Sequence, residues 1–194
     1  MKVITFIITV ILLLYPVFIF SQNKEHKTYY PNGNVEQTGN YDSEGKSIGE
    51  WKFYHENGKL QTTAYYNSNG KPFGEWKFYH ANGKLDGILN YTSPTEVTET
   101  LFYENGNVYS ETHLWLPDTD VAKLMYGNQV ERGPFKSYFE NGKLNKVGSY
   151  NNGNPDGEWK IYDENGILRE VYSSFIGMTP LKSQKYDEKG NLIQ

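Results

Sequence analysis

The residues that could carry chemistry are few, and they recur at regular positions. Four histidines are present, His26, His55, His80 and His113. His55 and His80 stand at the same place in two nearly identical segments, a spacing that could present two imidazoles to a metal. A zinc site needs three or four converging ligands, however, and the matching places elsewhere hold Tyr, Phe or Asp. We therefore interpret both as half-buried packing residues beside a turn, and expect no metal and no cofactor.

Carboxylates are also periodic. They precede the turns, as Glu56 does, and the tryptophans, as Glu50 does. Catalytic carboxylate pairs need unequal environments that separate their pKa values, whereas periodic carboxylates are typical of solvated cross-strand partners, here Glu56 with Lys59. The sequence contains no Gly-x-Ser-x-Gly, phosphate-loop or dinucleotide motif. We expect no catalytic residues and no enzyme activity.

Composition excludes further classes of function. The 194 residues include 19 Lys or Arg and 23 Asp or Glu, which gives a net charge of −4. Nucleic-acid binding calls for clustered basic residues, so we expect no nucleic-acid partner. The absence of cysteine excludes disulfides and thiolate chemistry. The 17 Tyr, 10 Phe and 19 Gly favour strands joined by tight turns.

The chain consists of repeated units. Gly49–Leu60 and Gly74–Leu85 are almost identical, and Gly157–Leu168 is a third close copy. Weaker copies bring the number of units to about seven, each marked by one turn glycine: Gly33, Gly58, Gly83, Gly106, Gly142, Gly166 and Gly190. Such periodicity is typical of repeat proteins in which each unit contacts mainly its neighbours.

Each unit is predicted to be a β-hairpin. Asn57-Gly58 matches the two loop residues of a type I′ turn, which would place Trp51 opposite Ala64 and Phe53 opposite its own partner, Thr62. Because strand side chains alternate between faces, one face of the sheet collects Trp, Phe and Leu. The more polar face collects Lys and Tyr.

We therefore predict an all-β fold, an elongated antiparallel β-hairpin repeat array in one twisted sheet. A second, glycine-containing turn returns the chain to the next unit. A single sheet leaves its apolar layer poorly covered. Two solutions stay open, since the sheet could curl around its own aromatic rings or another molecule could cover them.

Residues 1–21 are predicted to be a secretory signal peptide. Lys2 is followed by the apolar run Val3–Phe20 and by Ser21. Cleavage after Ser21 would leave 22–194 as an exported repeat domain, in the periplasm, in the cell envelope or secreted. The alternative is that the run, close to the ~18 apolar residues of a candidate span, remains as a membrane anchor. An uncleaved segment is the expected route to a membrane.

An insertion at about 113–130 interrupts the repeat. Insertions in repeat arrays often lie on one face, sometimes the binding face, and Trp115, Asp118 and Asp120 are candidate contact residues there. Asp118 and Asp120 supply too few oxygen ligands for a calcium loop. The alternative interpretation is a surface loop or a flap that covers part of the sheet.

A second candidate surface is a row of aromatic residues on the face opposite the tryptophans. Every unit has one at the same distance before its turn, and the binding candidates among them are Tyr54, Tyr79, Phe102, Tyr138 and Tyr162. Such rings could bind sugar rings or a protein partner. The structural interpretation is that they stack on one another and on Lys stems to hold the hairpins in register.

The unit Gly-Glu-Trp-Lys-Phe-Tyr-x-x-Asn-Gly-Lys-Leu, followed by a Tyr and a second glycine turn, resembles the MORN repeat variant. The resemblance covers 29–192 and is loosest where Glu99 and Ser183 stand at the Trp position. Proteins of this kind are bacterial and often exported, and some are described as antitoxin-like. The resemblance implies a β-hairpin array with a binding or scaffolding role and implies no catalytic residues.

Two functions follow as expectations. The first is an exported, non-catalytic interaction or scaffold protein with an unidentified protein partner, antitoxin-like by resemblance. The alternative is a module that binds cell-wall polysaccharide through its aromatic residues.

Overall fold

The computed structural model of the chain describes residues 23–116, 129–176 and 179–193, and all regular structure in that part is β-strand. The strands are β1 Lys24–Tyr29, β2 Val35–Tyr41, β3 Ser47–Tyr54, β4 Leu60–Tyr66, β5 Gly74–Tyr79, β6 Leu85–Ser93, β7 Glu96–Phe102, β8 Val108–Trp115, β9 Val130–Tyr138, β10 Leu144–Asn151, β11 Asn154–Tyr162, β12 Leu168–Ile176 and β13 Thr179–Lys185.

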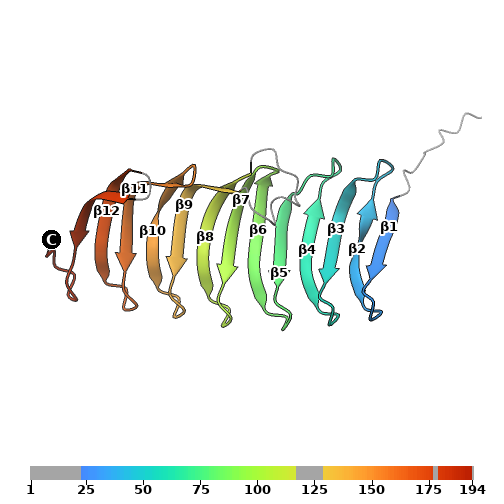
Figure 1. The fold of residues 1–194 in the computed structure, drawn as a ribbon, viewed down its shortest axis with the longest axis horizontal. Helices are drawn as coiled ribbons and strands as arrows, with labels where there is room; N and C mark the ends of the chain where they lie inside the picture. Colours follow the sequence, from blue (N-terminus) through green and yellow to red (C-terminus); the bar gives the residue numbers. More distant parts are fainter. Residues whose placement is uncertain (1–22, 117–128, 177–178, 194) are drawn as a thin grey trace, which may run out of the picture.

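The strands form one open antiparallel sheet in chain order, from β1 at one edge to β13 at the other (Figure 1). Extensive contacts join only strands that are consecutive in the chain. The predicted all-β hairpin array is therefore confirmed. Alternation of side chains produces the two faces, as in β8, where Ser110, Thr112 and Leu114 are buried and the residues between them are more exposed.

The turns differ from the prediction. After β3, His55 N donates to Lys59 O at 2.8 Å and Gly58 N donates to His55 O at 2.8 Å. The loop thus has three residues, and only Gly58 among them has a positive φ, +82°. This is the arrangement of a type I turn followed by a glycine bulge. The type I′ turn predicted for Asn57-Gly58, which requires a positive φ at Asn57 as well, is wrong.

The predicted core register is nevertheless confirmed. Trp51 lies opposite Ala64, and Phe53 lies opposite Thr62. The pairing shifts between Phe53 and Tyr54, so a bulge absorbs the extra loop residue before the core positions are reached.

A true type I′ geometry occurs elsewhere. Asn152 is the only non-glycine residue with a positive φ in the described part of the chain, at +49°, and Gly153 follows at +77°. Asn151 pairs with Asn154 across them, which leaves a two-residue loop between β10 and β11. Both central residues have the positive φ that such a turn requires.

One face of the sheet holds the core, and we call it the tryptophan face after Trp51, Trp76 and Trp159, which are 3 %, 3 % and 0 % exposed. Trp51 lies against Gly39 of β2 so closely that a Cβ at Gly39 would be 2.2 Å from the indole ring. Gly148 has the same relation to Trp159, at 2.1 Å. The glycines are required by space here, because each indole ring lies across the neighbouring strand.

Aromatic neighbours complete the cover of each indole. Around Trp51, the ring centroids of Tyr41, His26 and Phe53 lie 4.9, 5.4 and 6.2 Å away. Burial raises the pKa of Tyr66, which also packs here, to about 12. Of the two solutions left open by the sequence, the open sheet thus covers its tryptophans with its own rings, without closing on itself.

The asparagines of the hairpin turns join neighbouring hairpins along one end of the strands, where these turns form a row. Asn57 Oδ1 accepts from Lys59 N at 3.0 Å inside its own turn, and Asn57 Nδ2 donates to Ala81 O in the next turn at 2.9 Å. The same two bonds recur at Asn32, Asn105 and Asn141. The turn therefore uses both the donor and the acceptor of the Asn amide.

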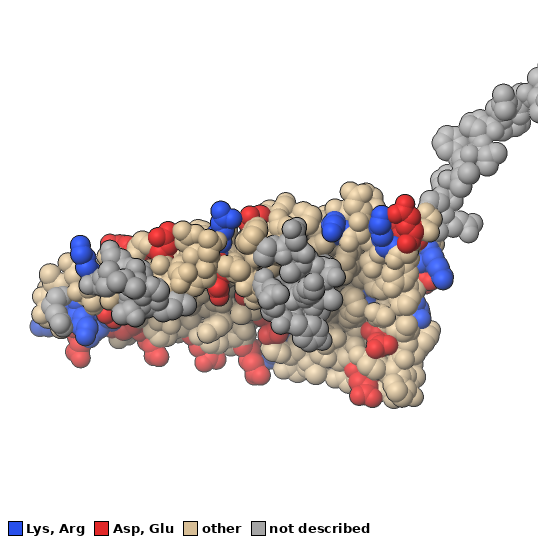
Figure 2. Space-filling view, turned by 45° about the horizontal axis from the view of Figure 1, so that its top comes forward, with Lys and Arg blue, Asp and Glu red and all other residues tan. Residues whose placement is uncertain are grey.

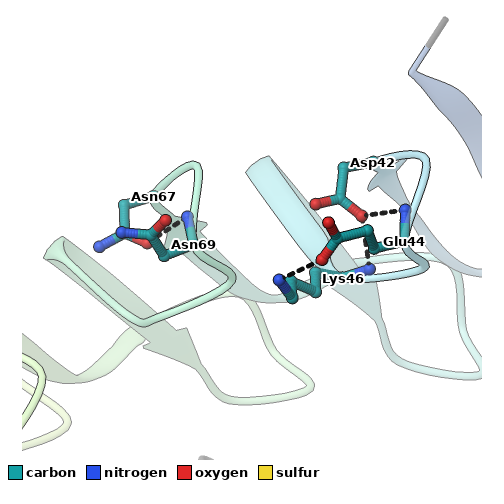
Figure 3. Close-up of polar contacts among 5 residues, drawn as sticks. All are labelled: Asp42, Glu44, Lys46, Asn67 and Asn69. Atoms are coloured by element: carbon teal, nitrogen blue, oxygen red, sulfur yellow. Dashed lines mark hydrogen bonds and ion pairs between the residues drawn. The ribbon is translucent and has the colours of Figure 1, made fainter. Parts of the chain in front are cut away.

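The turns at the opposite ends of the strands, such as those between β2 and β3 and between β4 and β5, are closed by side chains as well. Asp42 Oδ1 accepts from the backbone N–H groups of Glu44 and Lys46, each at 2.9 Å (Figure 3). Asn67 has the same role in the neighbouring turn, where it accepts from Asn69 N at 2.9 Å. These bonds satisfy turn N–H groups that have no partner in the sheet ladder.

Two predicted segments lie outside the described residues, namely the signal peptide predicted at 1–21 and most of the insertion at 113–130, including Asp118 and Asp120. Within the described residues, no helix is long and apolar enough to cross a membrane.

Gly39→Ala tests the contact between indole and glycine. The added methyl group has no space beside Trp51, so we expect a loss of about 1–3 kcal/mol in the free energy of unfolding, measured by urea titration. In a Trp51→Leu background the same change should cost much less. Equal costs in the two backgrounds would show that the ring is not the obstacle.

Asn57→Asp tests the bonds between turns. It keeps the acceptor for Lys59 N but removes the donor to Ala81 O, and we expect a loss of about 1 kcal/mol in thermal unfolding. Asn82 is the matched control, because in the described structure its side chain makes only the local bond, to Lys84 N. If Asn82→Asp costs as much as Asn57→Asp, the bond between turns contributes nothing.

Candidate functional site

A single row of residues across the tryptophan face shows where the repeat breaks. The odd-numbered strands contribute Trp or Phe to this row except at Glu99, and the even-numbered strands contribute smaller residues except at Leu89. In strand order the row is Gly39, Trp51, Ala64, Trp76, Leu89, Glu99, Thr112, Phe135, Gly148 and Trp159. Glu99 of β7 lies opposite Leu89 on one side and Thr112 on the other. A carboxylate thus replaces the aromatic ring at the middle of the sheet.

The neighbouring row has a second exception in the same place. Its positions on the even-numbered strands hold Gln37, Thr62, Gly87, Ser110, Lys146 and Glu170. Gly87 of β6 is the one residue without a side chain, and it lies between Phe78 and Leu101. Its φ is not in the left-handed region, so the backbone does not require glycine here.

The two exceptions meet in a hollow of about 280 Å³. Gly87 and Leu89 of β6 lie between Trp76 and Phe78 of β5 and Glu99 and Leu101 of β7, and all six residues line it. A Cβ at Gly87 would lie 3.0 Å from Leu101 Cδ2. Any side chain at this position would therefore reduce the space.

The electrostatics of the hollow are acidic. Burial raises the pKa of Glu99, and the charge of Glu131 raises it further. Asp86 also lines the hollow and lies 3.1 Å from His80 Nε2. The described lining residues include neither Lys nor Arg. The hollow thus has a half-buried carboxylate on one side, aromatic rings on the other and no cation among its described lining residues, which suits it to bind a positive group.

The predicted aromatic row lies on the face opposite the tryptophan face, at the ends of the strands. Tyr54, Tyr79, Phe102, Tyr138 and Tyr162 are the last residues of β3, β5, β7, β9 and β11, and all five are half-buried. None of the ring contacts among the described residues joins two of the five, because every second strand is roughly 10 Å away.

Some backbone carbonyls of this row have a structural role. Tyr54 O accepts from Tyr30 Oη at 2.6 Å, and Tyr138 O accepts from Tyr103 Oη at 2.8 Å. Trp115, the other described candidate, ends β8 and is half-buried between Glu96 and Val130. The structure thus does not bring the described candidates together in one pocket.

Three of the four histidines have polar partners among the described residues, namely His26 with Gln37, His55 with Tyr79 O and His80 with Asp86. His55 Nε2 lies 2.8 Å from Tyr79 O, a bond to the next hairpin. Lys59, predicted to pair with Glu56, instead donates from Nζ to Asn82 O at 2.8 Å, because it points along the edge toward the next turn. Within the described residues, no group of three or more His, Cys, Asp or Glu could hold a metal ion.

The Glu–Lys pairs of the sheet lie within single strands. Lys52 Nζ is 2.9 Å from Glu50 Oε2, and the equivalent pairs are Glu75–Lys77 and Glu158–Lys160. Two residues apart on one strand, these side chains share the face opposite the tryptophans.

The hollow was not predicted, although its signal is in the sequence. Glu99 at the Trp position by itself indicates only a loose copy of the repeat. Gly87 was not singled out, since among 19 glycines it resembles any other. Alignment of the units position by position would have shown two exceptions on adjacent strands, and only the pairing of β6 with β7 shows that they meet.

Glu99→Gln tests the burial of this carboxylate through its pH dependence. Because the folded-state pKa of Glu99 is raised, the stability contributed by its protonated form is complete below the ordinary glutamate pKa of 4.5. It is lost as the pH rises past the raised pKa. The Gln variant has no such loss, so its Tm advantage should grow from pH 4.5 to pH 8.

A difference of about 1 kcal/mol corresponds to roughly 2–4 °C for a chain of this size. The exposed turn residue Glu104 supplies the control Glu104→Gln. A constant difference between Glu99→Gln and the unmodified chain across this pH range would mean that Glu99 is freely solvated.

The match to a family model agrees with this architecture. The family model for the MORN repeat variant matches 22–43, 48–72, 74–92, 95–115, 131–152 and 155–173. The TcdB2-TccC3-Cdc42 crystal structure contains a chain 15 % identical to this one, with a TM-score of 0.22, and the match covers 84 % of this chain and 10 % of the other. No curated protein matches. With six matched units spread over a sheet built from one repeated hairpin, the chain belongs to the MORN repeat variant family.

Proposed function

We propose that the chain is a non-catalytic module that binds a protein partner through its tryptophan face. MORN repeats indicate a repeat-based binding or scaffold module. The observation that supports a site on this face is the hollow at Gly87 and Glu99, where the otherwise packed row of rings is interrupted. Asparagine side chains bond four pairs of successive turns in the described structure, whereas Asn82, in the turn beside the hollow, makes only a local bond.

Surface charge supports a protein partner over nucleic acid. On the face shown in Figure 2, Lys and Arg side chains stand apart, with acidic and uncharged surface between them. Nucleic-acid binding uses continuous basic patches. Polysaccharide binding by the opposite face remains the alternative and is treated as an outcome of the experiment.

Export is part of the proposal and depends on the sequence of 1–21 alone. If the segment is a leader, the partner is met in the cell envelope or outside the cell. The antitoxin-like role implied by the resemblance has no support in the described residues, and we do not include it.

Crosslinking in the native cell tests the proposal. The full chain, with a C-terminal tag, is expressed there, crosslinked and purified, and the captured proteins are identified. We expect a reproducible protein partner that binds the purified chain with a 1:1 calorimetric isotherm.

The control for the calorimetric binding measurement is the same purified chain after heat unfolding. Capture of no partner by a folded bait, together with co-sedimentation of the chain with purified wall glycan, would replace the proposal by the polysaccharide alternative.

A further inference from the structure

Another unit of the repeat has a side chain at the position where the hollow lies. Gly87 and Lys146 occupy the same position of their units, in Leu85-Asp-Gly87-Ile-Leu89 and Leu144-Asn-Lys146-Val-Gly148. Both lie on the tryptophan face, on even-numbered strands. The place that is empty in one unit is therefore occupied by a basic side chain in the other.

Lys146 shows how a cation binds at this position. Its Nζ lies 4.5 Å from the ring centroid of Trp159 on the following strand and 5.8 Å from that of Tyr172. The amine is thus held over aromatic faces, and its aliphatic stem extends along the sheet. The strand that follows Gly87 carries Glu99 at the position of Trp159.

In the unit of Gly87, the lysine is absent and a carboxylate has replaced the ring that would bind it. Aromatic walls remain on the other side, at Trp76 and Phe78, and Asp86 adds a second carboxylate. A carboxylate pairs with an ammonium or guanidinium group through charge-assisted hydrogen bonds. The hollow thus has a negative end and apolar walls, with no cation among its described lining residues.

We propose that this hollow binds a basic side chain, Lys or Arg, of a partner protein, with its charged group at Glu99 and its apolar stem between Phe78 and Leu101. The proposal rests on the proposed function and specifies its partner. A volume of about 280 Å³ suits one side chain, since pockets for larger ligands run from roughly 300 to 1,000 Å³. A bare metal ion would require more oxygen ligands than two carboxylates supply.

Titration of the full chain with single-residue probes tests the proposal. The probes are acetyl-lysine methylamide and acetyl-arginine methylamide, and acetyl-norleucine methylamide is the uncharged match for the lysine stem. Amide shifts at Gly87 and Gln129, which both line the hollow, are followed by NMR. We expect saturable shifts with a Kd on the order of 1 mM, the scale for ligands of this size, and binding about tenfold weaker for norleucine.

Three variants test separately the contribution of the Glu99 carboxylate and that of the empty volume at Gly87. Glu99→Gln should weaken the basic probes by about tenfold, and Glu104→Gln should leave them unchanged. Gly87→Lys reproduces the Lys146 unit, so it should fill the hollow and abolish probe binding. If Gly87→Lys does not fold, as judged by its amide spectrum, the comparison of Glu99→Gln with Glu104→Gln decides.

Equal binding of norleucine and lysine probes, an unchanged affinity in Glu99→Gln, or no shift up to about 50 mM probe, well above the expected Kd, would overturn the inference. If a captured protein still binds Glu99→Gln with full affinity, the proposed function stands and this site is wrong. Capture of no protein by a chain that binds the probes would instead refute the proposed function.

Discussion

The contact on which this sheet depends is an indole ring lying across the neighbouring strand at a residue too small to block it. An isolated sheet has only one layer of side chains on each face, so it has little means of excluding water. Trp51 and Trp159 reach 3 % and 0 % exposure because glycine on the adjacent strand lets each ring lie flat. Aromatic neighbours then close around the rings, so a fold without a second layer still has a core.

The asparagine turns extend this local solution along the sheet. Hairpins joined only by strand pairing would be free to twist relative to one another. The amide of Asn57 closes its own turn and bonds the next one. Asn and Gly thus have separate roles in the turn, since Gly58 supplies the positive φ and Asn57 supplies the connection. The result is an array in which each hairpin depends on its neighbours.

The sequence predicted the fold well because the repeat determines it. The pairing of Trp51 with Ala64 is correct even though the turn type is wrong, since the bulge after Phe53 compensates for the longer loop. The site was not predictable to the same degree. A residue's identity, such as glycine at 87, does not reveal whether the backbone or a neighbouring side chain requires it. That distinction depends on φ and on which strands are adjacent, which only the structure provides.

Amide hydrogen exchange, strand by strand, in Trp76→Ala and in the unmodified chain tests the central claim most directly. Loss of this ring should cost about 3–5 kcal/mol, and because extensive contacts join only consecutive strands, protection should fall in β4 to β6 and remain in β11 and β12. A uniform loss of protection across all strands would contradict the account, because it would show one globally cooperative core instead of local contacts between an indole and its neighbouring strands.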